Sequence, residues 1–236
     1  CAHDPADRFA TVAELRVQLL GVLREVVASD RAEAAAPTAA PSLLFAPPDV
    51  SGDVLSWREL PALMVDSTDS QSGWLASLDV RDPVARLGAL EHAPERSAEV
   101  LLALGRAALL AERPDVVTAV TEELLAGDPW EWRAVWLQGL AALAGGDAHA
   151  ARAAFNAVYG QVPGELAPKL ALALACERTG ELDIAEGLYG VCARTDAAYV
   201  APAAFALARI RASRGAVGEA VAAPQPVPPP RRPPPE

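Results

Sequence analysis

The sequence predicts an all-α protein built mainly from stacked helical hairpins. Hydrophobic residues make up 52% of the chain but aromatic residues only 5%, so most apolar side chains are Ala, Leu and Val. Side chains of this kind fill the thin spaces between helices well and the core of a sheet sandwich poorly. In the second half of the chain, prolines and glycines also recur 34 residues apart. Together these two observations favour a helical repeat architecture.

The first predicted element is a helix within residues 1–29. Thr11 and Glu14 have the spacing of a capping box, in which the threonine hydroxyl accepts a hydrogen bond from a free amide of the first turn. The apolar residues that follow have helical spacing and predict one buried stripe. This stripe consists of Val12, Leu15, Leu19, Val22 and Val26. We expect its partner surface either outside this chain or among residues 40–80.

Residues 30–96 predict an irregular, partly ordered linker. The prolines in 36–41 and 46–49 prevent a continuous helix because proline lacks the backbone donor that a helix needs. The segment nevertheless carries more apolar residues than a disordered linker does. These are Leu43, Leu44, Phe45, Trp57, Leu60, Leu63, Met64 and Trp74. We therefore expect order against neighbouring elements, with short helices near 56–63 and 71–79.

Residues 97–223 carry the internal repeat. The residues that share the 34-residue spacing are Pro129 and Pro163, Gly105 and Gly139, and Gly146 and Gly180, with Gly215 a further 35 residues on. This period is typical of the tetratricopeptide repeat (TPR), in which each unit is a pair of antiparallel helices. On that template the units span 98–131, 132–165 and 166–199, and a fourth begins near residue 200. The sequence therefore predicts a TPR domain over residues 97–223.

The last 13 residues, 224–236, include eight prolines. Such a composition favours a disordered tail of polyproline II conformation, because it has no apolar core to join. A solvated tail is one interpretation. A proline-rich ligand for a partner domain is the alternative.

Charge and length exclude several classes of partner. The net charge of −11 argues against non-specific binding to nucleic acid or to an anionic membrane surface. No apolar stretch approaches the roughly 20 residues that a membrane-spanning helix needs. The sequence shows no secretory signal, and its three cysteines suit a reducing compartment. We therefore expect a cytoplasmic protein.

The opening residues, Cys1-Ala-His-Asp-Pro-Ala-Asp-Arg8, resemble the last conserved block of eukaryotic-type protein kinases, which precedes the final helix of the large lobe. The resemblance implies that residues 1–29 are the C-terminal end of a kinase domain. The resemblance implies that Arg8 forms a buried ion pair with the glutamate of an Ala-Pro-Glu motif, for which the planar guanidinium is suited. Ala93-Pro94-Glu95 lies after Arg8, whereas the kinase motif precedes this arginine. We therefore interpret residues 93–95 as the start of the first repeat helix, and we expect the chain to be a fragment of a longer protein.

Four further stretches resemble the C-terminal half of the PknG-like (protein kinase G) serine/threonine kinases of actinobacteria. They are residues 20–28, 60–66, 130–136 and 163–173. The resemblance implies a parent enzyme that phosphorylates Ser or Thr of proteins with ATP and Mg²⁺ and carries a rubredoxin-like metal module upstream. It also implies that the repeats serve docking or dimerisation. The implied protein partner is a regulator with a forkhead-associated domain.

This chain lacks the groups that phosphoryl transfer requires. It has no glycine-rich phosphate loop followed by a suitable lysine, no His-Arg-Asp catalytic loop and no Asp-Phe-Gly. We therefore predict no catalytic, cofactor-binding or metal-binding residue within it. A stand-alone TPR adaptor for protein interactions is the alternative to a kinase fragment.

Four residues of the repeats are candidates for contact with a partner. Trp132 and Trp136 share one helix face with Arg133 beside them, and Lys169 begins the corresponding helix of the next unit. For the tryptophans, burial between repeats and a docking hot spot are both open. Arg133 and Lys169 fall where this class of repeat lines its concave groove. Cys176 and Cys192 are expected to be small core thiols.

Overall fold

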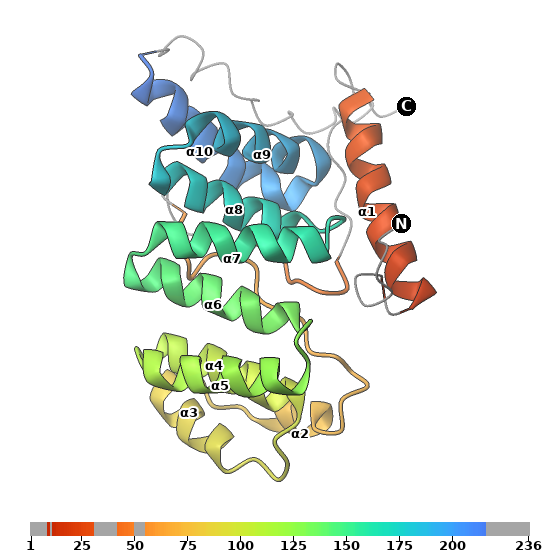
Figure 1. Ribbon diagram of the computed structural model, residues 1–236, viewed down its shortest axis with the longest axis vertical. Helices are drawn as coiled ribbons and strands as arrows, with labels where there is room; N and C mark the ends of the chain where they lie inside the picture. The colour runs from red at the N-terminus through yellow and green to blue at the C-terminus, as the bar shows by residue number, and fades with distance from the viewer. Residues whose placement is uncertain (1–8, 10, 31–41, 50–54, 216–236) are drawn as a thin grey trace, which may run out of the picture.

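The computed structural model describes residues 9, 11–30, 42–49 and 55–215. Within these ranges every regular element is a helix, apart from one isolated bridge between Phe45 and Leu63. The all-α class is confirmed, and Figure 1 shows helices α3 to α10 stacked into one elongated array. No helix of the described residues is long and apolar enough to cross a membrane. Arg8 and the predicted tail 224–236 lie outside the described residues.

Three consecutive helical hairpins form the centre of the array. Their first helices begin at residues 98, 132 and 166 and their second helices at 114, 148 and 182, so the 34-residue period is confirmed. The six helices are α4 (Ala98–Leu110), α5 (Pro114–Gly127), α6 (Trp132–Gly145), α7 (Ala148–Gln161), α8 (Leu166–Thr179) and α9 (Leu182–Thr195). Each packs against the next along the chain. The apolar side of every hairpin is thereby covered by its neighbours.

The helix that follows the third hairpin starts earlier than the repeat predicts. α10 (Ala197–Ser213) follows α9 after one residue, Asp196. The Asp196 carboxylate accepts a hydrogen bond from the backbone N–H of Ala198 at 2.8 Å and so caps the new helix. Because the chain turns at this cap, the predicted boundary near residue 200 lies three residues too late.

Two short helices precede the hairpins. α2 (Ser72–Ser77) falls within the predicted range, whereas α3 (Pro83–Glu91) is an additional helix that packs against α4. The Asp82 carboxylate accepts a hydrogen bond from the N–H of Ala85 at 2.8 Å. A proline directly after this cap is favourable, because the backbone N–H of the first helical residue would have no acceptor within the helix.

The helix expected near residues 56–63 does not form, and the chain makes only a turn there before it becomes extended. Pro61 disfavours helical backbone angles at the residue before it, Leu60. The side chain of Leu60 is nevertheless buried, as the apolar content of the segment predicts. Residues 93–95 likewise do not begin a helix, because α4 starts at Ala98 after the cap Ser97.

Close packing within the second hairpin depends on a glycine. A Cβ atom added to Gly139 of α6 would lie 2.5 Å from a ring carbon of Phe155 of α7. The Phe155 side chain is fully buried, as is that of Tyr189, which occupies the equivalent position in the next unit. The predicted small and aromatic positions of the repeat are thus confirmed, and they set the distance between helices.

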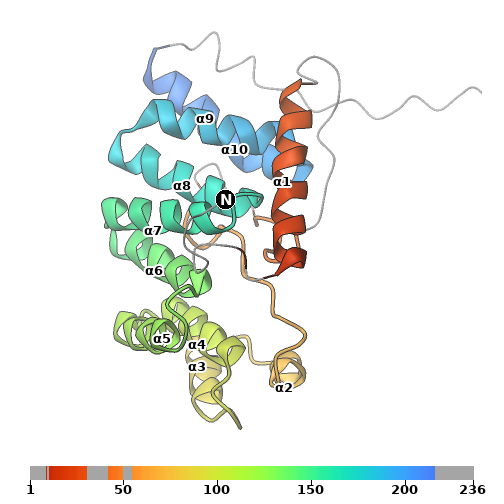
Figure 2. The ribbon, with the colours of Figure 1, turned by 45° about the vertical axis from the view of Figure 1, so that its right-hand side comes forward.

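α1 (Val12–Asp30) is separate from the stack and packs against α9, and Figure 2 shows it upright beside the ends of the stacked helices. Its cap is confirmed, since the Thr11 hydroxyl accepts from the N–H of Glu14 at 3.1 Å. The predicted apolar stripe, however, is not covered, and Val12 is 82% exposed. The face that packs on the array contains Gln18 and Gly21 instead.

Each first helix of a hairpin ends at a residue in the left-handed conformation. Gly146 and Gly180 both have φ 83°, and Glu112 occupies the equivalent place of the first hairpin with φ 58°. In all three cases the next N–H bonds to the helix carbonyl five residues before it, which satisfies an unpaired acceptor. Glycine adopts this conformation freely, whereas a residue with a Cβ is strained by about 1 kcal/mol.

We predict that Glu112→Gly stabilises the protein by up to about 1 kcal/mol, because it removes this strain. The free energy of unfolding in urea is the measurement. Glu112→Ala is the matched control, since it removes the same carboxylate but keeps a Cβ. A glycine variant that is no more stable than the alanine variant would contradict the explanation.

Candidate docking groove

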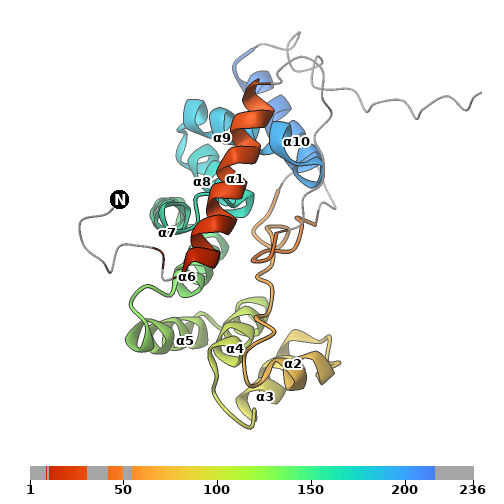
Figure 3. The same cartoon turned by 90° about the vertical axis from the view of Figure 1, so that its right-hand side faces the viewer.

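An extended segment of the same chain covers the inner face of the array, the face formed by the first helices α4, α6 and α8. We call this segment, residues 42–49 and 55–71, the strap. Figure 3 shows it running beside α4 and away from α5 and α7. Near one end, the Ser42 hydroxyl donates to the carboxylate of Glu165 at 2.7 Å. Helical repeats commonly bind partners on their concave face, which makes this face the candidate docking groove. Here the strap of the same chain fills it.

The strap inserts an aromatic side chain into the array. The Phe45 ring lies 5.5 Å from the ring of Trp132 and 5.0 Å from that of Trp136, centroid to centroid. Trp136 in turn lies 5.1 Å from Phe155, between α6 and α7. Phe45 is 2% and Trp136 1% exposed, so this aromatic cluster is core. Trp132 is partly buried, and its aromatic neighbour is the strap's own Phe45.

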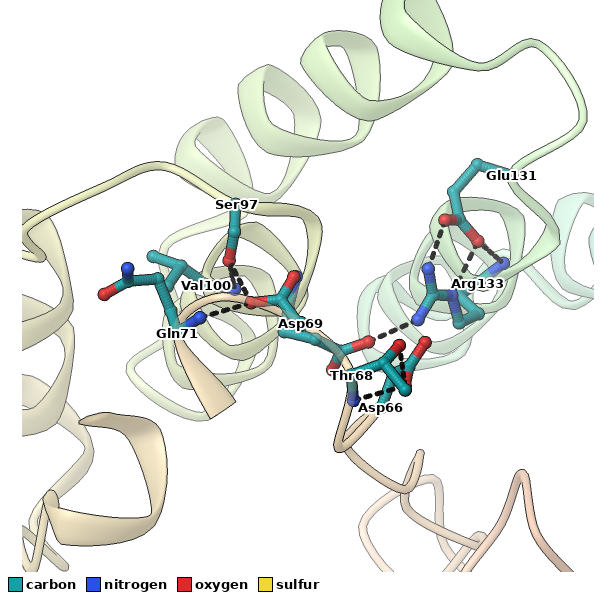
Figure 4. A network of polar contacts seen from close by, with 9 residues as sticks. Asp66, Thr68, Asp69, Gln71, Ser97, Val100, Glu131 and Arg133 are labelled. Carbon is teal, nitrogen blue, oxygen red and sulfur yellow. Dashed lines mark hydrogen bonds and ion pairs between the residues drawn. The ribbon is translucent and has the colours of Figure 1, made fainter. Parts of the chain in front are cut away.

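Arg133 lies in a polar network at the start of α6 (Figure 4). Its guanidinium donates to both carboxylate oxygens of Glu131, at 2.8 and 2.5 Å, and also to the carboxylate of Glu99 on α4. Glu99 is only 4% exposed; burial raises its pKa, while Arg133 acts in the opposite direction. Arg133 thus joins the first two hairpins, and its donors are used within the chain.

Asp69, near the end of the strap, belongs to the same network. One carboxylate oxygen accepts from the Ser97 hydroxyl at 2.7 Å and from the backbone N–H of Gln71 at 2.8 Å. The other oxygen accepts a longer bond, 3.4 Å, from the N–H of Glu99. Burial raises the pKa of Asp69, but these hydrogen bonds outweigh it and hold the pKa below its usual value. The carboxylate therefore fastens the strap to the start of α4.

Lys169 is fully buried at the start of α8, at a position where this class of repeat lines its concave groove. Its ammonium pairs with the carboxylate of Glu25 on α1 and also donates to backbone carbonyls, including that of Pro163. The ring of Tyr159 lies 4.8 Å from the ammonium nitrogen. The lysine therefore binds α1 to the array and is not presented to a partner.

Two further contacts hold α1 close to the array. The side-chain oxygen of Gln18 accepts a hydrogen bond from the N–H of Gly164 at 2.7 Å. A Cβ atom added to Gly21 would lie 2.0 Å from the carbonyl oxygen of Gly164, so the two backbones touch here. Glycine on both sides makes this approach possible.

A cavity of about 360 Å³ lies where α1, the strap and the α8–α10 region meet. Phe45, Met64 and Tyr199 supply apolar wall, and Glu165 supplies a carboxylate that is 7% exposed. Burial raises the pKa of Glu165, whereas the hydrogen bond from Ser42 acts against this shift. The cavity shows that the three parts meet without filling all the space between them.

The part of the chain that the structure describes has two features that bear on metal and thiol chemistry, the placement of its potential metal ligands and its two cysteines, Cys176 and Cys192. No three His, Cys, Asp or Glu residues gather there in a way that could hold a metal ion. Cys176 and Cys192 are buried, and burial raises their thiol pKa to about 11 and about 12. They remain protonated at neutral pH and fill space in the core, as expected for small buried thiols.

We predict that Asp69→Asn loosens the strap and lowers the free energy of unfolding by about 1–2 kcal/mol, because hydrogen bonds to a charged acceptor are lost. Since the pKa of Asp69 is lowered on folding, the wild-type advantage is present above the unfolded pKa and disappears as pH falls through the folded one. Urea unfolding of both proteins across acidic pH measures this. The control is Asp79→Asn, at a highly exposed side chain; equal effects of the two variants would refute the role of Asp69.

We predict that Glu25→Leu costs about 3–5 kcal/mol of stability, because it leaves the buried Lys169 ammonium without its carboxylate. The double variant Glu25→Leu/Lys169→Met should recover most of this loss, since no charge then remains buried. Asp183→Leu, which breaks the exposed pair with Arg214, should cost less than about 1 kcal/mol. Urea unfolding compares the variants, and a double variant as unstable as the single one would contradict the assignment.

Comparison with known proteins identifies the family to which these repeats belong. The family described as protein kinase G tetratricopeptide repeat matches residues 54–233. The chain is 34% identical over 260 residues to the serine/threonine-protein kinase PknG of Mycolicibacterium smegmatis and 32% identical over 265 residues to that of Mycobacterium leprae. Both alignments cover 97% of this chain but only 34% of the relative, so the chain spans about a third of the length of these curated relatives. The chain belongs to the protein kinase G tetratricopeptide-repeat family.

Proposed function

We propose that this chain is the docking and regulatory part of a PknG-like serine/threonine protein kinase. The observation that carries the proposal is a hairpin array of 34-residue period in a chain that aligns over 97% of its length with two such kinases. The whole protein would phosphorylate Ser or Thr of cytoplasmic proteins with ATP and Mg²⁺. The groups for that chemistry, and a rubredoxin-like metal module, would be supplied by other parts of the protein.

The outer face of α1 supports a contact with the catalytic lobe. Leu19, Leu23 and Val26 are each more than half exposed, and they belong to a helix whose other face is fastened to the array. Exposed apolar residues gathered on one helix face are typical of an interaction site. We propose that the catalytic lobe covers this face, so that α1 connects the lobe to the array.

The outer side of the strap supports docking of a protein partner. Leu43, Met64 and Val65 of the strap are 74%, 47% and 50% exposed, next to a groove whose deeper residues are used internally. A partner would therefore contact the strap rather than the tryptophans beneath it. The partner that we propose is a regulator with a forkhead-associated domain.

Calorimetric titration of the chain with the forkhead-associated regulator of the same organism tests docking. We expect binding, and we expect Val65→Asp to weaken it about tenfold, as loss of an apolar contact in an interface does. Val84→Asp on α3, also at an exposed valine (66%), should leave the affinity unchanged. Light scattering of the chain alone separates docking from self-association. Binding by the whole kinase but not by this chain would overturn the proposal.

A further inference from the structure

Two arginines lie close to one tryptophan on the inner face of the first hairpin. The guanidinium carbon of Arg58 lies 4.5 Å from the ring centre of Trp57, and that of Arg106 lies 5.5 Å from it. Trp57 and Arg58 belong to the strap, whereas Arg106 comes from α4. Trp57 is only 8% exposed, so its indole fixes both side chains at the junction of strap and array.

Among the described residues, no carboxylate forms an ion pair with Arg106. Its Nη1 atom is enclosed without a hydrogen-bond partner, the one such side-chain nitrogen or oxygen in the described residues. Burial lowers the pKa of Arg106, and the charge of Arg58 lowers it further. Other arginines of the array contact a carboxylate directly. Among them are Arg133, Arg152, Arg209, Arg211 and Arg214.

The positive charge of Arg58 is only weakly neutralised. The described carboxylate that pairs with it is that of Glu112, 3.8 Å away, and the two side chains are 51% and 84% exposed. An ion pair of this kind contributes little, because water and salt screen it. Among the described residues the cluster therefore holds two cations beside one exposed carboxylate, in a chain whose net charge is −11.

The chemistry of this arrangement fits an anionic group. A guanidinium that stacks on an indole keeps its N–H donors at the edge of its plane, where carboxylate and phosphate bind through two parallel hydrogen bonds. An incoming anion can approach over the half-exposed Arg58. It would give the charge of Arg106 a counterion, which the described residues do not provide.

We propose that Arg58 and Arg106, held by Trp57, form a receptor for an anionic group of the docking protein, either a phosphorylated residue or a carboxylate. This inference rests on the proposed docking function and adds the chemistry of the partner. Because Trp57 and Arg58 belong to the strap and Arg106 to α4, an anion bound here would also tighten the strap on the array.

The indole N–H resonance of Trp57, assigned with the help of Trp57→Phe, reports on binding at this place. We expect inorganic phosphate to shift it saturably at constant ionic strength, where chloride does not. Arg58→Gln and Arg106→Gln should each weaken phosphate binding about fivefold or more, because a charge-assisted pair of hydrogen bonds is lost. Arg81→Gln, at a 95% exposed arginine, is the control and should have no effect.

Short peptides that carry either one phosphothreonine or a run of glutamates distinguish the two sources of the anion. Tighter binding of one peptide identifies the source, and the unphosphorylated threonine peptide should bind to neither arginine. Phosphate binding that survives Arg58→Gln, a change at an exposed side chain that does not threaten folding, would overturn the inference. Regulator binding that is unaffected by either arginine variant would also overturn it but would leave docking intact. Phosphate binding without any regulator binding would instead contradict the docking function.

Discussion

The structure depends on one constraint, which is that no single helical hairpin can bury its own apolar side. Each hairpin is covered by the next. Within a hairpin, the distance between the two helices is set by small residues that face aromatic ones, as at Gly139 and Phe155. The 34-residue period follows from this requirement, since each unit must present the same surfaces in the same order. The inner face that remains is where the strap lies.

Candidate docking residues of the repeats form internal contacts, because the strap and α1 pack against the array. Trp136 packs on Phe45, Arg133 joins two hairpins through Glu99, and Lys169 holds α1 through Glu25. A chain segment in the groove protects buried surface from water and at the same time presents a new outer surface. Any partner of the array therefore meets the strap first, and recognition depends on its exposed side chains and on the charge beneath them.

The repeats could be predicted from the sequence because their signals are local and periodic. The start of α3 has an equally local signal, Asp82-Pro83, in which a capping residue is followed by proline. The helix expected near residues 56–63 does not form, because Pro61 disfavours helical backbone angles at Leu60 even though the apolar residues have helical spacing. The roles of Lys169 and Arg133 could not be predicted, since Glu25 lies 144 residues from Lys169 and only the fold brings them together. Exposure of a polar residue cannot be deduced from its repeat position alone when another segment fills the groove.

The central claim is that the chain's own strap occupies the inner face of its repeat array. Nuclear Overhauser contacts between the ring protons of Phe45 and the indole of Trp136 in solution test this most directly. Strong contacts are expected, because the two ring centres lie 5.0 Å apart in the core. An indole of Trp136 that is open to solvent and shows no contact with Phe45 would contradict this claim.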